Sequence, residues 1–355
     1  MYGGTKLEMR VLNEEFEQIA IIQDFSSLQW TQKYYESGQF ILQVGLRYAH
    51  LLPDARYIYR VNTDVLGVID SMKADKAFTM RGQFAGSQLM ERAINYRVTY
   101  TGTAEEVCRA IVNEFCIEPE DPLRIIPHLI LGEFQGLESE EVTVQPFGKT
   151  VFESIREVLT ANEMSFRLRY VFETNDLIFE VYRGLDRTQS QTENDWRVFS
   201  ADLYNVSNEA FTRTMDTRNY AYVVNGNEDN NEDEFVTIVE IDDGRPRAEV
   251  WVQDNTRLTE DMTEEEFEAA IRQTGLNKLA EFNIADTSEC TIAVDNIDDY
   301  AIGDKCTYIN KRVGVTIEQR ITEIREVFEP NNVSTAVVLG KDQLTVGKKI
   351  LREVK

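Results

Sequence analysis

The class of fold is indicated most directly by Leu177-Ile178-Phe179-Glu180-Val181-Tyr182 and by the turn Gly184-Leu185-Asp186-Arg187-Thr188 that follows it. The first run is apolar and strand-like, and the turn carries residues typical of a chain reversal. A second half-buried strand is expected at Tyr220-Ala221-Tyr222-Val223-Val224-Asn225-Gly226. We interpret the turn as structural, with Asp186 capping it and Arg187 pairing with a neighbouring acid. An arginine placed for a substrate is the alternative.

The N-terminal part, roughly residues 7 to 82, is expected to form an antiparallel meander. Short runs of β-branched and aromatic residues recur there with turn signals between them. The expected strands are 16–22, 28–30, 40–44, 57–61, 66–70 and 77–82. Several short strands at this spacing suggest a barrel or a sandwich.

The pattern changes period near residue 100. Thr103 with Glu106, and Thr150 with Glu153, form capping boxes in which a hydroxyl and a carboxylate each satisfy a free backbone donor. Each box is expected to open a helix with one apolar face. Strands at 164–172 and 177–182 follow the second helix. The segment therefore predicts a small α/β domain inserted into the β-rich part.

The C-terminal part returns to the strand pattern. Strands are expected at 235–241 and 247–253, and a third capping box, Thr263 with Glu266, opens a helix over about 263–284. Gly275 lowers the propensity of this helix by about 1 kcal/mol relative to alanine. Further strands are expected at 290–294, 305–310, 314–328 (with a bend) and 334–339. The predicted class is mainly β with an α+β insertion.

Composition limits the possible partners. The chain has 355 residues, enough for two or three domains, and a formal net charge of −25. Such a charge argues against tight binding to nucleic acid or to anionic membranes, because both need basic surface. No apolar run approaches the roughly 20 residues of a membrane span, and the N-terminus lacks the apolar core of a signal peptide. Buried free thiols are expected at Cys108, Cys116, Cys290 and Cys306.

Residues that could carry catalysis are few. His50 and His128 have no acidic or thiol partner nearby in sequence, so zinc sites and Ser-His-Asp triads are poorly supported. Neither a phosphate-binding loop nor a dinucleotide-binding turn is present. Glycoside hydrolysis would need a carboxylate pair, for which the candidates are Glu240 with Asp242 and Asp298 with Asp299. Surface carboxylates are the simpler interpretation.

Two further features have both a functional and a structural interpretation. The acidic run 227–234 could hold calcium, but it lacks the order of an EF-hand and is expected to be a flexible loop. Trp30, Tyr34, Tyr35 and Phe40 could form a ligand platform, but at strand and turn spacing they are expected in a core or a subunit interface. We assign no catalytic, cofactor-binding or metal-binding residue.

Several short motifs together resemble one family, the tail-hub proteins of siphophages. Through that family the chain also resembles the baseplate hubs of contractile phages and the base of type VI secretion spikes. The motifs cover nearly the whole chain in the expected order, and they are 28–40, 80–82, 89–94, 184–188, 199–200, 220–226, 247–249, 300–305, 320–321 and Gly340.

The resemblance implies a structural protein of the virion tail, made in the bacterial cytoplasm, without enzymatic activity or cofactor. It implies two tube-like β-barrel domains, residues 1–100 with about 195–225 and residues 226–355, around an inserted α/β domain at 101–194. Three chains would form a ring that joins the tail tube and distal tail proteins to the tail tip. DNA would pass without specific binding, and a fibre or lysin would belong to another chain.

One alternative function and one local hypothesis stay open. The alternative is an acidic protein that binds or hydrolyses glycans with its β-rich faces. The hypothesis is that residues 347–355, which are locally basic in an acidic chain, dock an acidic partner, although a solvated segment is the simpler interpretation.

Overall fold

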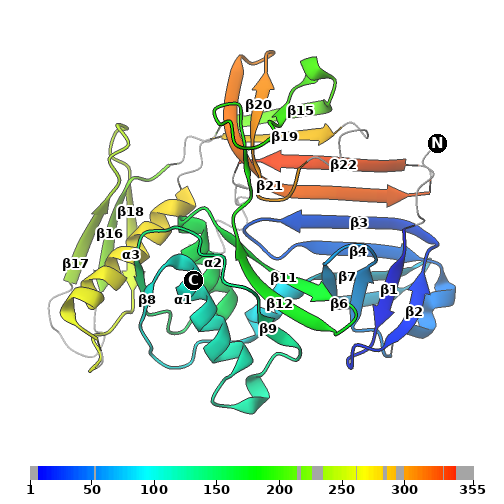
Figure 1. Ribbon diagram of the computed structural model, residues 1–355, viewed down its shortest axis with the longest axis horizontal. Helices are drawn as coiled ribbons and strands as arrows, with labels where there is room; N and C mark the ends of the chain where they lie inside the picture. The colour runs from blue at the N-terminus through cyan, green and yellow to red at the C-terminus, as the bar shows by residue number, and fades with distance from the viewer. Residues whose placement is uncertain are drawn as a thin grey trace.

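The computed structural model describes residues 7–51, 53–213, 217–225, 235–260, 262–282, 286–292, 300–330 and 332–340. It is mainly β, with the α-helices gathered on one side of the molecule (Figure 1). The described strands form one 14-stranded sheet and three small sheets. The main path of the large sheet runs β15-β19-β22-β21-β3-β4-β7-β6-β5-β1-β2, and β13, β14 and β20 lie off this path.

The N-terminal strands are antiparallel, as predicted, but they do not form a simple meander, because β4 pairs with β7 and β1 pairs with β5. The strand at Met9–Leu12 was not predicted. The N-terminal strands alternate buried and exposed side chains, as in β4, where Phe40, Leu42 and Val44 point into the core and Gln39 and Gln43 are exposed. The strands are β1 (Met9–Leu12), β2 (Gln18–Ile22), β3 (Phe25–Lys33), β4 (Gln39–Val44), β5 (Tyr57–Arg60), β6 (Leu66–Ala74) and β7 (Phe78–Phe84).

The C-terminal strands continue the same sheet. They are β19 (Asp286–Ile292), β20 (Lys305–Asn310), β21 (Val315–Glu329) and β22 (Asn332–Leu339). Shorter strands from before residue 214 join them: β13 (Asp186–Arg187) and β14 (Val198–Phe199) pair with β20, and β15 (Val206–Arg213) pairs with β19. These strands enclose a core of their own, separate from that of β1 to β7.

β21 connects the two halves of the chain. Its first part pairs with β20, and its second part pairs with β22 and β3. The register shifts between Ile321 and Glu323, within the strand for which the sequence predicts a bend at no particular position. Beside the β3–β21 pairing, the Arg60 guanidinium holds the Glu326 carboxylate through two bonds, Nη1–Oε2 of 2.6 Å and Nη2–Oε1 of 3.1 Å.

The predicted pair of closed barrels is not confirmed. At the ends of the main path, β15 and β2 each pair with one neighbouring strand, and no pairing among the described strands closes a sheet on itself. The direct pairing of β3 with β21 is the physical reason, because it joins the strands of both expected barrels into one open sheet.

The predicted α/β insertion contains α1 (Ala104–Val112) and α2 (Val151–Ala161), and both helices begin with the predicted capping boxes. Its strands are β8 (Tyr100–Gly102), β9 (Leu129–Leu131), β10 (Val142–Val144), β11 (Ser165–Val171) and β12 (Asp176–Tyr182). Short helical turns, not predicted from the sequence, lie at Leu46–Leu51, Ala85–Glu91, Asn113–Ile117, Pro122–Arg124 and Ala201–Leu203.

A three-stranded sheet with one long helix forms a further unit beside the insertion (Figure 1). β16 (Tyr220–Asn225) is central, antiparallel to β17 (Phe235–Glu240) and parallel to β18 (Glu249–Asp254). α3 (Glu264–Phe282) opens with the predicted capping box. It buries Ile271 and Leu279 against this sheet and also contacts β10 and α2.

Gly275 lies where α3 comes nearest to the small sheet. A Cβ atom there would be 2.6 Å from Val239 Cγ2 and 2.8 Å from Val223 Cγ2. We expect Gly275→Ala to destabilise the protein by about 1–3 kcal/mol, because overpacking outweighs the gain of about 1 kcal/mol in helix propensity. Chemical denaturation measures the change. Glu268→Ala, on the exposed side of α3, is the control and is expected to stay within about 0.5 kcal/mol. A stabilised Gly275→Ala variant would contradict this packing.

Candidate functional site: the junction of the sequence motifs

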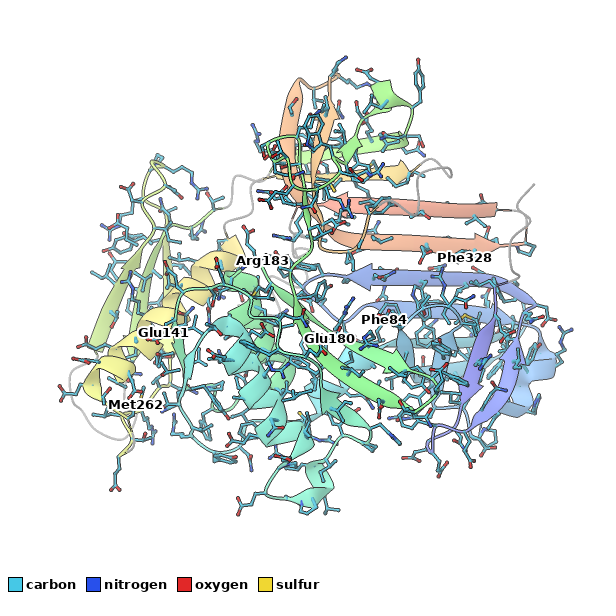
Figure 2. The ribbon with its side chains drawn as sticks, in the orientation of Figure 1. Phe84, Glu141, Glu180, Arg183, Met262 and Phe328 are labelled. Atoms are coloured by element: carbon cyan, nitrogen blue, oxygen red, sulfur yellow. The ribbon has the colours of Figure 1, made fainter. Side chains whose placement is uncertain are left out.

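Four segments that the sequence singles out meet at one place. They are Tyr34 just after β3, the turn that leaves β12, the Gly303-Asp304 pair before β20, and Arg320 in β21. The segment leaving β12 starts at Arg183, labelled in Figure 2, whose guanidinium donates to the carbonyl oxygens of Glu138 and Asn162. It then runs parallel to the start of β20. The junction thus connects the α/β insertion to the large sheet.

Asp304 is the centre of this junction. Its carboxylate accepts hydrogen bonds from the Leu185 N–H (2.9 Å), from the Ala301 N–H (3.0 Å) and from the Arg187 Nε–H (2.9 Å). The Asp304 side chain is only 3% exposed. A buried carboxylate is stable when it is paired and hydrogen-bonded in this way, since the donors replace the water that it loses.

The Gly184–Thr188 turn has the predicted internal structure. Asp186 Oδ1 accepts from the Thr188 N–H at 2.9 Å and from the Thr188 hydroxyl at 2.7 Å. Burial opposes the charge on Asp186, but these hydrogen bonds prevail and hold the pKa of its carboxyl below the usual range. The capping by Asp186 and the ion pair of Arg187 with an acid, here Asp304, are both confirmed. The arginine is therefore occupied in holding the fold together.

Two glycines allow the backbones to meet. A Cβ atom on Gly184 would lie 2.1 Å from the carbonyl carbon of Gly303. Gly303 has a φ of +92°, and a Cβ atom there would lie 2.4 Å from the Tyr34 ring. Larger residues would separate the turn from β20, because a backbone atom cannot rotate out of the way as a side chain can.

Tyr34 and Arg320 complete the junction. The Tyr34 hydroxyl lies 3.1 Å from the Glu163 carbonyl oxygen and 3.3 Å from that of Tyr182, and the Tyr34 N–H donates to the Thr322 carbonyl oxygen. Arg320 Nη1 donates to the Gly303 carbonyl oxygen at 2.6 Å, and its Nη2 pairs with Glu163 at 3.2 Å. Both side chains therefore link the insertion to the large sheet.

Burial raises the pKa of Tyr34 to about 12. Because the folded state favours the neutral phenol, the contribution of Tyr34 to folding stability is fully present below pH 10. It is lost as the pH rises from about 10 to 12. We expect Tyr34→Phe to lower stability at pH 8 by about 1 kcal/mol through the lost hydrogen bond. The variant is also expected to lose less stability than the wild type between pH 10 and 12. Urea denaturation of both proteins at pH 8, 10 and 12 measures these differences in stability. An equal loss of stability in the two proteins between pH 10 and 12 would contradict the prediction.

Three of the four aromatic residues considered as a ligand platform lie in the core, and the fourth, Tyr35, is half-buried with its ring edge-on to that of Tyr34 at 4.7 Å. Trp30 is fully buried, and Tyr34 and Phe40 are 1% exposed, which confirms their prediction as core residues. The Trp30 ring packs against Phe40 and Phe84. Phe84, labelled in Figure 2, lies at the end of β7. An adjoining cavity of about 110 Å³, lined in part by Lys33, Glu36, Phe84 and Arg167, is below the roughly 300–1,000 Å³ of ordinary ligand pockets.

The histidines and carboxylates considered for catalysis do not come together in one site among the described residues. His128 packs its ring against Phe16, and a ring nitrogen of His50 contacts the Arg47 carbonyl oxygen. Glu240 and Asp242 are both exposed, and Asp242 caps a turn by accepting from the Gly244 N–H. Residues 227–234, Asp298, Asp299 and 347–355 lie outside the described residues. Within the described ranges no group of three or more histidine, cysteine or acidic residues is placed to hold a metal ion.

The four cysteines are buried and free, as predicted. Burial raises the pKa of Cys116, Cys290 and Cys306 to about 12, so these thiols stay protonated and unreactive at neutral pH. No helix in the described part of the chain combines the length and apolar character needed to cross a membrane.

The motifs of the sequence do not reveal the roles of Asp304, Glu163 and Arg320. Asp304 and Arg320 lay within quoted motifs, and the signal for Asp304 was an acid directly after a glycine at the start of a strand. Glu105 was missed altogether, although it is fully buried and its carboxylate accepts from the Gln135 and Leu137 N–H groups at 2.7 and 3.0 Å. Its place in the first turn of a helix gave no hint of these partners, which follow some 30 residues later.

The family follows from a match over almost the whole chain. The model of the siphovirus ReqiPepy6 Gp37-like proteins matches residues 8–341. The chain belongs to this family. The predicted resemblance to siphophage tail proteins is thereby confirmed. No curated protein matches the sequence.

Solved structures of tail proteins, two of them from prophages, share the fold of this Gp37-like chain. A tail protein of Neisseria meningitidis MC58 has a TM-score of 0.59 at 12% identity, covering 95% of this chain and 97% of its own. The 43 kDa tail protein of prophage MuSo2 from Shewanella oneidensis has a TM-score of 0.57 at 13% identity, covering 94% and 98%. Prophage tail protein gp18 from Listeria monocytogenes EGD-e has a TM-score of 0.54 at 12% identity, covering 98% of both chains.

Proposed function

We propose that this Gp37-like protein is the hub of a phage tail. Three copies form a ring that joins the tail tube and distal tail proteins to the tail tip and lets DNA pass. The observation that carries the proposal is the family match over residues 8–341, because it spans every segment that meets at the junction.

The chemistry of the junction supports a structural role. Asp304, Arg187 and Arg320 are engaged in ion pairs or hydrogen bonds with other parts of the same chain. Such an arrangement sets the relative position of the insertion and the large sheet, and a ring subunit needs that rigidity. A net charge of −25 further suits a channel for DNA, since carboxylates repel phosphate and prevent sticking. A fibre or lysin on another chain would then supply contact with the host.

The division into two tube-like domains around an insertion at 101–194 stays a prediction. Its support is that β1 to β7 and β19 to β22 bury separate cores. Within it we assign residues 198–213 to the second domain rather than the first, because β14 and β15 pair with β20 and β19.

The oligomeric state tests the hub proposal. We expect native mass spectrometry of the purified chain mixed with the tail tube protein of its own phage to give complexes holding three copies. Negative-stain images are expected to contain rings with a central opening. A chain that stays monomeric and does not bind the tube protein would overturn the proposal.

A further inference from the structure

The sheet β16–β18 has one face without a partner in the described structure. α3 lies across the other face and covers Ala221, Val223, Val239 and Val252 (Figure 1). Side chains of neighbouring positions in each strand point the opposite way, since successive residues of a strand alternate between faces. The strand register places Ile238, Tyr222 and Trp251 in one row across this outward face.

The two outer members of this row are apolar and exposed, and Tyr222 between them is half-buried. Trp251 is 60% exposed and Ile238 is 51% exposed. The next row adds Val236, which is 43% exposed, beside Val224, which is buried. Apolar residues scattered singly on a surface need no explanation, but a contiguous row on one sheet face is typical of a contact site.

Charged groups lie along one side of the row, where Tyr220 pairs with Glu240 and Glu249. Arg247 lies 3.4 Å from the centre of the Tyr220 ring, and its Nε pairs with Glu249 at 2.9 Å. Glu240 and Asp242, at the same end of the sheet, are exposed carboxylates. The bordering charge is therefore negative on balance, and an apolar segment with basic residues is the complementary occupant.

Residues 341–355 have this composition. They contain five basic and two acidic residues in a chain of net charge −25, together with Leu344, Val346, Ile350, Leu351 and Val354. The segment follows Gly340, whose N–H donates to the Arg320 carbonyl oxygen at the junction. In Figure 1, β22 runs toward the side of the molecule that holds α3 and the small sheet. Fifteen residues can span about 50 Å when extended.

We propose that residues 341–355 dock on the outward face of β16–β18, with their apolar side chains on the Ile238–Tyr222–Trp251 row and their basic side chains near Glu240 and Asp242. This goes beyond the hub proposal and does not depend on it. It assigns an intramolecular partner of the chain itself to a surface that would otherwise be exposed.

Photocrosslinking of the full chain tests the contact. With a benzoylphenylalanine in place of Leu351, we expect the main crosslinked peptides to come from residues 235–254. The same probe at Leu123, which is 91% exposed in the insertion, is the control and is expected to give no such crosslink. Crosslinks from position 351 only to other parts of the chain, or none at all, would overturn the proposal.

Tryptophan quenching gives a second readout in the full chain. The chain has three tryptophans, of which Trp30 is buried, so Trp196→Phe leaves Trp251 as the accessible one. In that background we expect Leu351→Glu to raise the acrylamide quenching constant at least twofold, with an unchanged melting temperature. Val313→Glu, at a residue 52% exposed, is the control and should leave it unchanged. Quenching unaffected by Leu351→Glu, or protection of Trp251 only after another tail protein is added, would assign the face to a different occupant and overturn the proposal.

Discussion

Replacing Asp304 by alanine is expected to lower the free energy of unfolding by about 3–5 kcal/mol. The change removes the acceptor for the Leu185 and Ala301 N–H groups and leaves the Arg187 guanidinium, which is 23% exposed, without its carboxylate. In the unfolded variant these donors are bonded to water, whereas in the folded variant they would have no acceptor, and this difference lowers stability. Chemical denaturation followed by circular dichroism measures the loss.

The matched control for this prediction is Asp202→Ala. Asp202 also pairs with a cation, Lys311, but the two side chains are 52% and 75% exposed. Exposed pairs contribute about 0–1 kcal/mol, so this variant is expected to unfold almost as the wild type does. Asp304→Asn, which keeps the shape and one acceptor oxygen, should fall between the two. Equal, small losses for Asp304→Ala and Asp202→Ala would show that the junction does not hold the fold together.

Gly184→Ala is expected to lower the free energy of unfolding by about 3 kcal/mol or more. The added Cβ would lie 2.1 Å from Gly303 C and 2.4 Å from the Asp304 nitrogen, both backbone atoms. The turn must move away from β20 to remove this steric clash. Such a movement would break the hydrogen bonds that Asp304 accepts from Leu185 and Arg187. Thermal unfolding and limited proteolysis at residues 183–197 measure the effect.

Gly45→Ala is the control for this substitution. A Cβ atom at Gly45 would have Arg47 Cγ at 3.9 Å as its only near neighbour among the described residues, so it fits without displacement. We expect this variant to change stability by less than about 1 kcal/mol in either direction. If Gly184→Ala also changes stability by less than about 1 kcal/mol, the turn does not approach β20 as closely as described.

The local elements of this fold were predictable from short stretches of sequence. The capping boxes at Thr103, Thr150 and Thr263 each formed as expected, because both partners of a box lie within three residues of each other. The same holds for the Asp186 turn, whose donor is Thr188. The alternation of apolar and polar residues likewise predicted most of the N-terminal strands.

The pairing of distant segments was not predictable in this way. β3 pairs with β21, which follows almost 300 residues later, and the sequence of neither strand identifies the other as its partner. This pairing is why closed barrels, expected from resemblance, are not found among the described strands. The role of Asp304 depends on the same long-range contacts, since its partners Leu185 and Arg187 come more than 110 residues earlier.

The sequence by itself determined the acidic character, the mainly β class, the helix starts, the buried thiols and the family of this protein. Each of these depends on composition, on motif order or on residues within about one helical turn of one another. Only the tertiary structure decided that Tyr34, Gly184, Asp304 and Arg320 meet at one junction. The physical reason is that a buried charge or a close backbone contact is stable only once all of its partners are in place, and those partners come from four separate parts of the chain.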